Sequence, residues 1–415
     1  MIKKKNKKIF YLFTIFIIIL LFFGLANLAK IEKKVVEKYP NLRFAKYLFK
    51  TNPLVNKISN DYNTKFLPNT QFVKLNFEKK KINFKDKYYK PPNDKSIGYK
   101  GYGTFFIEIY KDKVLAVDFL GNIYSVDDYK NSATTKDLES DLITQRVFDI
   151  LVVEDILYVS HLTNIKSCKK INISFSKIKS GNLNFEKLFE STDCNNKGTP
   201  GRMQYFIHEN KKGILLSTIG GAYDKPGHVA QDQSSIFSKI LFIELESKEN
   251  YIYSSGHRVA QGLFAENNLI LATEHGPRGG DEINKILFKR NYGWPISSYG
   301  EKYSFKYEKE PYYKKNHDDL GFEEPLFSFV PSIGISEIIK LPNNFSPHLQ
   351  NRFIVSSLAG SSIFLTMFDK NFSRLISLEK IFLNERIRDL KYDFKNKLIL
   401  LALEQDGELG ILSLK

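Results

Sequence analysis

The residues whose types best suit ligand binding or catalysis are concentrated between Gly256 and Tyr299. This stretch reads GHRVAQGLFAENNLILATEHGPRGGDEINKILFKRNYGWPISSY, and it combines a Gly-Pro step, two adjacent carboxylates and a Tyr-Gly-Trp-Pro sequence. Loops rich in Gly and Pro beside strands leave backbone carbonyl groups available to bind a ligand. Calcium prefers carbonyl and carboxylate oxygens of this kind. The stretch therefore predicts a binding site built from loops.

Arginine is the second kind of residue suited to a site. Arg258 and Gln261 flank a turn into the strand expected near Leu269, and Arg386 and Arg388 alternate within ERIRDL, which places both on one side of a strand. A planar guanidinium binds a carboxylate through two parallel hydrogen bonds, which an ammonium group does not. These residues predict either a site for a carboxylate-bearing ligand or structural ion pairs.

Short strands must position these groups, because helical periodicity is almost absent after the N-terminal segment. Thr104–Tyr110, Val114–Phe119 and Asn122–Val126 are rich in β-branched and aromatic residues and are separated by short turns. Asp406-Gly407 between two apolar runs is a hairpin signal. Similar runs recur at 150–160, 213–219, 268–273, 352–356, 363–367, 397–403 and 408–412. Antiparallel meanders at this spacing predict an all-β propeller or sandwich, and strand period alone neither chooses between them nor counts blades.

The stretch from Gly256 to Tyr299 resembles the soluble quinoprotein glucose/sorbosone dehydrogenase family, and the similarity runs from about Gly103 to Leu412. Pro331-Ser332-Ile333 also fits a short motif of that family. The resemblance implies a six-bladed β-propeller of four-stranded antiparallel blades over residues 81–415. It also implies an aldose dehydrogenase that uses pyrroloquinoline quinone (PQQ) and calcium and passes electrons to a separate acceptor.

The resemblance also implies roles for individual residues. The PQQ carboxylates would be held by residues of three short segments, namely Arg258, Gln261, Arg386 and Arg388. The carbonyls of Gly276 and Pro277 would hold the calcium that bridges to PQQ. A second, structural calcium would be held by Asp281, Glu282 and the carbonyl of Tyr292.

The chain departs from the family at the positions that perform catalysis. The general-base histidine of the family, four residues before an arginine that corresponds to Arg202, falls on Gly198, and its aspartate partner falls on Gly221. Glycine can neither abstract a proton nor orient an imidazole. His228, in the loop after Gly221, is a candidate replacement, and a solvated loop histidine is the alternative.

Two further polar positions of the family are also apolar here, as Val259 and Ala359. Two functions therefore remain open. One is a PQQ- and calcium-dependent aldose dehydrogenase with lost or altered catalysis, and the other is a non-catalytic propeller, braced by calcium, that binds a sugar, a glycan or a protein partner.

The N-terminus predicts export. Several lysines precede an apolar run from Ile9 to Ala26, which is interrupted by Thr14 and Gly24. The length of the run fits either a membrane anchor or a cleaved signal peptide, so residues 1–29 are predicted to be one of these. The lysines would keep the N-terminus in the cytoplasm and place the rest outside, in the cell envelope. Residues 30–80 are predicted to be a spacer.

Charge and cysteine content narrow the classes of partner. The net charge is +16, but no basic stripe interleaved with aromatic residues follows the N-terminus, so a nucleic-acid partner is not predicted. No glycine-rich nucleotide motif appears, so a nucleotide cofactor is not predicted. Cys168 and Cys194 are the only cysteines. In an exported chain they predict a disulfide, with two unpaired thiols as the alternative.

Overall fold

The computed structural model describes residues 74–84, 103–165, 168–178, 182–192, 199–220, 229–301 and 313–415, and the structural statements below concern these residues. The predicted export segment, residues 1–29, lies outside them. Among the residues described, no helix is both long enough and apolar enough to cross a membrane.

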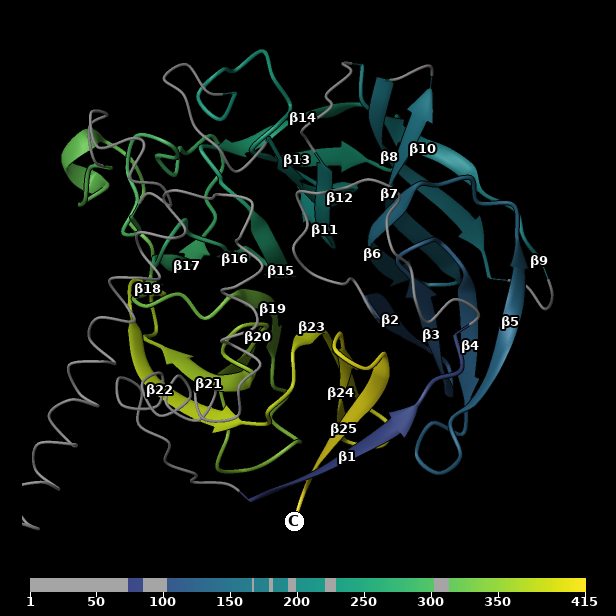
Figure 1. Cartoon of the computed structure of the whole chain (residues 1–415). Coiled ribbons are helices and arrows are strands. Elements are labelled where there is room, and N and C mark those ends of the chain that lie inside the picture. Colours follow the sequence, from purple (N-terminus) through teal and green to yellow (C-terminus); the bar gives the residue numbers. More distant parts are fainter. Residues whose placement is uncertain are drawn as a thin grey trace, which may run out of the picture. The chain divides into compact units, whose positions relative to one another are not determined.

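Six sheets form a six-bladed β-propeller, which confirms the predicted fold (Figure 1). Blade 1 consists of β2 (Phe105–Tyr110), β3 (Lys113–Asp118), β4 (Ile123–Asp127), β5 (Thr134–Ser140) and the added strand β9 (Asn182–Leu183). Blade 2 consists of β6 (Arg146–Val153), β7 (Ile156–Ile165), β8 (Cys168–Lys177) and β10 (Glu186–Glu190). Blade 3 consists of β11 (Thr199–His208), β12 (Lys211–Ile219), β13 (Lys239–Glu244) and β14 (Asn250–Ser255).

The other three blades follow the same antiparallel order. Blade 4 consists of β15 (Ala260–Glu266), β16 (Leu269–Glu274), β17 (Asp281–Lys285) and β18 (Phe327–Phe329). A short 3-10 helix, η3 (Asp318–Leu320), precedes β18. Blade 5 consists of β19 (Ile335–Lys340), β20 (Arg352–Ser357), β21 (Ser362–Phe368) and β22 (Leu375–Phe382). Blade 6 consists of β23 (Ile387–Asp393), β24 (Leu398–Leu403), β25 (Glu408–Leu414) and β1 (Leu75–Lys81).

The first strand of the chain completes the last blade. β1 pairs antiparallel with β25 from Leu75–Leu414 to Lys81–Glu408. The propeller therefore begins before residue 81, and the predicted spacer includes most of a strand. The sequence LNFEKKK has alternating partly buried and exposed positions and little apolar content, so pairing with β25, more than its own composition, makes it a strand.

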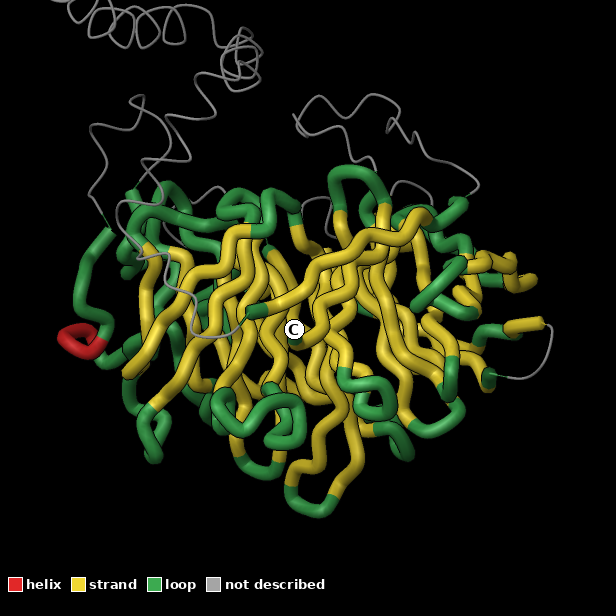
Figure 2. The backbone as a smooth tube through the Cα atoms, turned by 90° about the horizontal axis from the view of Figure 1, so that it is seen from below, coloured by secondary structure: helices red, strands yellow, loops and turns green. Residues whose placement is uncertain are grey.

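The blades pack face to face, so both faces of most strands are apolar. Between blades 2 and 3, for example, Ile171 and Ile173 pack in one cluster with Leu216 and Leu241. The innermost strands β2, β6, β11, β15, β19 and β23 contact one another around a closed ring, with β23 against β2. Figure 2 shows the strands running between two rims and connected by loops at both. The ring brings residues far apart in the sequence together on its axis.

Candidate functional site

The inner strands share a local irregularity close to their first residues. The strand register shifts between Val147 and Asp149, Pro200 and Met203, Ala260 and Gly262, Ile335 and Ile338, and Ile387 and Asp389. Such β-bulges turn the intervening side chains in a new direction. Arg202, Gln261, Glu337 and Arg388 lie within four of these bulges and make the contacts described below.

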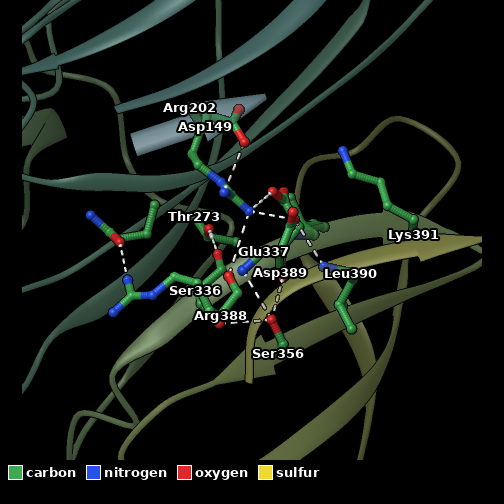
Figure 3. Close-up of polar contacts among 12 residues, drawn as sticks. Asp149, Arg202, Thr273, Ser336, Glu337, Ser356, Arg388, Asp389, Leu390 and Lys391 are labelled. Carbon is green, nitrogen blue, oxygen red and sulfur yellow. Dashed lines mark hydrogen bonds and ion pairs between the residues drawn. The ribbon is translucent and has the colours of Figure 1, made fainter. Parts of the chain in front are cut away.

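Arg202 of β11 lies among three buried carboxylates (Figure 3). Its Nη1 donates to Asp149 Oδ1 at 2.9 Å, and its Nη2 donates to Asp389 Oδ1 at 2.6 Å and also to Glu337. These carboxylates come from β6, β23 and β19. One arginine therefore ties four inner strands together.

A second ion pair extends this network to β2. Lys391 Nζ lies 2.7 Å from Glu108 Oε1. Each acceptor carboxylate around Arg202 also receives a backbone N–H; the pairs are Met203 to Asp149, Ile107 and Leu390 to Asp389, and Ile338 to Glu337. We call the six charged residues the axial charge cluster: Glu108, Asp149, Arg202, Glu337, Asp389 and Lys391.

The axial charge cluster contains more acids than bases. Burial raises the pKa of Asp149 to about 6 and those of Glu108 and Glu337 to about 7, against the opposing attraction of the two basic groups. The cluster therefore holds protons near neutral pH. Arg202 and the three carboxylates around it are buried, so this part of the cluster closes the ring, whereas the side chain of Lys391 is 21% exposed.

Arg386 and Arg388 lie beside this cluster and share one carboxylate. Arg388 Nε donates to Glu404 Oε2 at 2.6 Å, and Arg386 Nη2 donates to Glu404 Oε1 at 3.1 Å. Arg388 Nη1 donates to Gln261 Oε1 at 2.9 Å. The structure thus brings together three of the four residues predicted to bind PQQ.

Arg258, the fourth of these residues, is held against the loop that follows β16. Its Nη1 donates to the carbonyl of His275 at 2.9 Å, and its guanidinium lies 5.1 Å from the ring centroid of Trp294. Its Nε is buried and has no hydrogen-bond partner. Burial lowers the pKa of His275; the charge of Asp281 opposes this shift, and the charges of Arg258 and Arg388 add to it.

Asp281 organises the Gly276–Gly280 loop. Its carboxylate accepts the backbone N–H of Gly276, Ile333 and Ile335, each at 3.0 Å. A Cβ on Gly276 would lie 2.1 Å from the carbonyl oxygen of Gly280, so the loop closes tightly on itself. The side chain predicted to bind calcium is therefore directed at backbone donors, which gives Asp281 a structural role.

Glu282, in contrast, has the surroundings of a cation ligand. Burial raises its pKa well above the usual value, and the nearby carboxylate of Glu274 adds to this effect. No basic side chain pairs with Glu282 in the described part of the chain. Asn284 Nδ2 donates to Glu282 Oε2 at 3.3 Å, whereas Asn284 Oδ1 and Ser328 Oγ are buried without partners, and Ser328 is the β18 neighbour of Glu282. An oxygen-only set of this kind fits a hard cation.

Tyr292, whose carbonyl was predicted to join Glu282 in a calcium site, is buried. Its hydroxyl donates to Lys285 O at 2.5 Å, and its ring stacks on His257 at a centroid distance of 4.6 Å. His257 Nδ1 lies 3.1 Å from Glu274 Oε2. Within the described ranges no group of three or more His, Cys, Asp or Glu side chains is arranged to hold a metal. A calcium site at Glu282 must therefore use carbonyl, amide or hydroxyl oxygens as well.

Several predictions concern residues outside the described part. Gly198, Gly221 and His228 all lie there, so the loss of the general base stays a prediction. Cys168 is disulfide-bonded, as predicted, and Cys194 lies outside the described residues.

Glu404 and the acids of the axial charge cluster are functional residues that were not predicted from the sequence. A signal for the latter exists: four inner strands each carry an acid among apolar neighbours, in FFIEIY, RVFDILVV, ISEIIK and IRDLKYD. An ionised group in an apolar strand needs a partner. Arg202 alone did not reveal which partner, because the contacts join blades far apart in sequence.

Comparison with known proteins places the fold in a family. The aldose sugar dehydrogenase YliI of Escherichia coli K12 is 28% identical over 216 residues, which are 48% of this chain and 56% of that protein. The chain thus spans about half the length of this relative. The apo form of the soluble E. coli aldose sugar dehydrogenase superposes with a TM-score of 0.61 at 18% identity, covering 75% of this chain and 96% of the other.

A PQQ-bound aldose sugar dehydrogenase from Streptomyces coelicolor has the same fold, with a TM-score of 0.57, 14% identity, and coverage of 83% of this chain and all of the other. Residues 153–411, more than half of the chain, match the family profile described as Glucose / Sorbosone dehydrogenase. This match includes every described site residue from Arg202 to Glu404. The chain belongs to the glucose/sorbosone dehydrogenase family.

Proposed function

We propose that this protein binds PQQ and calcium at the end of the ring that carries Arg258, Arg386 and Arg388, as an aldose-dehydrogenase-like protein of the cell envelope with lost or altered catalysis. The observation that carries the proposal is the contact of Arg388 with Gln261 and with the carboxylate that it shares with Arg386, while Arg258 lies three residues before Gln261 in the chain. Three guanidinium groups suit a ligand with several carboxylates, such as PQQ.

The described residues divide the binding work. Arg388 and Arg386 would contact ligand carboxylates, and the unpartnered Nε of Arg258 would take a further oxygen. The carbonyls of Gly276 and Pro277 would hold the calcium next to PQQ, and Glu282 would hold the structural calcium. When bound, PQQ supplies a two-electron acceptor for the oxidation of an aldose at its anomeric carbon.

Such a site would lack the expected residues for proton transfer. Gly198 and Gly221 stand where the resemblance expects the base and its partner, and loss of a general base typically slows a reaction by about 10²–10⁴-fold. This departure favours a second candidate function, a non-catalytic propeller that binds a sugar, a glycan or a protein partner at the same site.

PQQ reconstitution with calcium tests the proposal. Equilibrium dialysis should show PQQ binding to the wild type, at least tenfold weaker binding to Arg258→Met and Arg388→Met, and no change in the surface control Arg352→Met. Arg352 is suited to this comparison because it lies on β20, outside the proposed site, and its Nη1 donates to Ser377 Oγ at 3.0 Å. Absence of PQQ binding to the wild type would leave the non-catalytic propeller as the better reading.

Aldose oxidation with an artificial electron acceptor tests the missing base. The wild type should be very slow or inactive, and Gly198→His/Gly221→Asp should gain activity. Robust wild-type turnover that survives His228→Ala would show that the assignment of the missing base is wrong.

Export and membrane attachment are part of the proposal and rest on the lysine-flanked apolar run Ile9–Ala26. Cell fractionation and sequencing of the mature N-terminus test both. A soluble product that begins at Asn27 would contradict the anchor and retain export.

A further inference from the structure

The geometry points to Glu404 as the positioning residue of the arginine site, which orients Arg386 and Arg388 so that they bind a ligand carboxylate. The identity of the ligand as PQQ rests on the proposed function. The positioning role rests on contacts within the chain.

Glu404 follows β24 directly and is tied to the start of β23. Its backbone N–H donates to the carbonyl of Arg386 at 2.8 Å, so the two strand ends are joined by main-chain and side-chain contacts. The side chain of Glu404 is 9% exposed, whereas those of Arg386 and Arg388 are 21% and 19% exposed. The carboxylate lies beneath the guanidinium groups, and the guanidinium groups face outward.

The hydrogen bonds of Arg388 explain how its orientation is fixed. A guanidinium has five N–H donors in a rigid plane. Nε and Nη2 contact the same oxygen of Glu404, and Nη1 donates to Gln261. Three contacts from two neighbouring side chains determine the plane, and one N–H on each of Nη1 and Nη2 stays available for a ligand.

Glu404 also changes the charge of the site. Its burial opposes ionisation, but Arg388 and Arg386 outweigh this effect and hold the pKa of Glu404 below its usual value. The carboxylate is therefore ionised at neutral pH and reduces the net charge of the arginine pair. As a simple counter-charge it would weaken anion binding, and as a positioning group it strengthens anion binding by fixing the donors beforehand.

These two roles predict opposite effects for Glu404→Gln. The amide removes one negative charge and keeps nearly the same shape. If Glu404 were only a counter-charge, this variant would bind anions more tightly. Since a neutral amide holds two guanidinium groups less firmly than a carboxylate does, we expect at least tenfold weaker binding, despite the added positive charge.

The experiment uses the purified full chain and two probes. PQQ with calcium is the first, and benzene-1,2,4-tricarboxylate without calcium is the second; both dissociation constants are measured by calorimetry. Glu266→Gln is the matched control, because Glu266 also pairs with a basic side chain, Lys340, but lies on β15 at the surface. We expect Glu404→Gln to weaken the binding of both probes and Glu266→Gln to change neither dissociation constant by more than twofold.

Glu404→Asp guards against a folding defect. It keeps the charge but is one methylene shorter, so it can reach one arginine and not both, and its affinity should fall between those of wild type and Glu404→Gln. The melting temperature of each variant is recorded. If Glu404→Gln does not fold, the binding affinity of Glu404→Asp tests the inference instead. Equal or tighter binding by the deciding variant would overturn the inference.

The two probes separate the inference from the proposed function. If the wild type binds the tricarboxylate and not PQQ, the proposed function fails, and the tricarboxylate affinities of the variants still decide the role of Glu404. If the wild type binds neither probe, the site does not bind carboxylates, and both the proposed function and this inference are overturned.

Discussion

Replacement of Arg202 by methionine should destabilise the propeller by about 3–5 kcal/mol at pH 8. The substitution keeps an unbranched apolar stem and removes the guanidinium that contacts Asp149, Glu337 and Asp389. Loss of one partner of a buried ion pair typically costs this amount, because the remaining charge is left uncompensated. The three contacts share one guanidinium, so their contributions are not added. Since unfolding entropy grows with residue number, the melting temperature should fall by about 4–7 °C in a domain of this size.

The stability lost in Arg202→Met should depend on pH, and the direction of this dependence follows from the pKa values of the buried carboxyl groups. In the wild type, burial raises the pKa of Asp149 to about 6 and that of Glu337 to about 7. The native state therefore holds protons that the unfolded chain releases above about pH 4, and the free energy of unfolding falls as pH rises from about 4 to 7. Without Arg202 these pKa values rise further. The difference in the free energy of unfolding between wild type and Arg202→Met should thus be smaller at pH 5 than at pH 8.

Urea unfolding of wild type, Arg202→Met and the surface control Arg352→Met at pH 5, 6.5 and 8 measures this effect. The control should lose less than about 1 kcal/mol at each pH, as is usual for a surface substitution. A deficit of Arg202→Met below 1 kcal/mol at pH 8, or one independent of pH, would falsify the argument that this arginine compensates buried charge.

Three further predictions concern blade 4 and the cysteine. Glu282→Gln should abolish most of the stabilisation that calcium gives the wild type, and an unchanged wild-type melting temperature after chelation would remove the proposed metal sites. Tyr292→Phe deletes the hydroxyl that donates to Lys285 O and accepts from Leu287 N, so thermal unfolding should show a loss of about 1–3 kcal/mol; an unaltered melting temperature would contradict this. Cys168→Ser should cost about 3 kcal/mol, less any strain, and non-reducing peptide mapping of the wild type that finds this thiol unmodified would refute the bridge.

Local sequence was sufficient for the strands whose own composition favours them. β2, β3 and β4 lie within a residue of the runs expected from their β-branched and aromatic content, and the Asp406-Gly407 turn joins β24 to β25 as the hairpin signal predicts. Gly407 has φ of +66°, which glycine adopts without the steric cost of a Cβ. The number of blades came from the family resemblance, because strand period carries no information about how many sheets surround an axis.

Contacts between distant segments account for what the sequence did not reveal. β1 is a strand because β25, more than three hundred residues later, offers it an edge. Glu404 appeared as one acid before an Asp-Gly turn, and only the return of β24 alongside β23 places it between two arginines. Asp281 was expected to bind calcium because of the family resemblance, and this stays a prediction; the sequence did not reveal that the fold brings the N–H groups of Ile333 and Ile335 to its oxygens.

The pairing of β1 with β25 also sets an order for assembly. β1 is synthesised before the other described strands and has no partner until Glu408–Leu414 have been made. Blades 1 to 5 can form earlier, but the ring closes only after β25 is available to β1. A chain truncated just before Glu408 would therefore leave β1 without its partner and the propeller open.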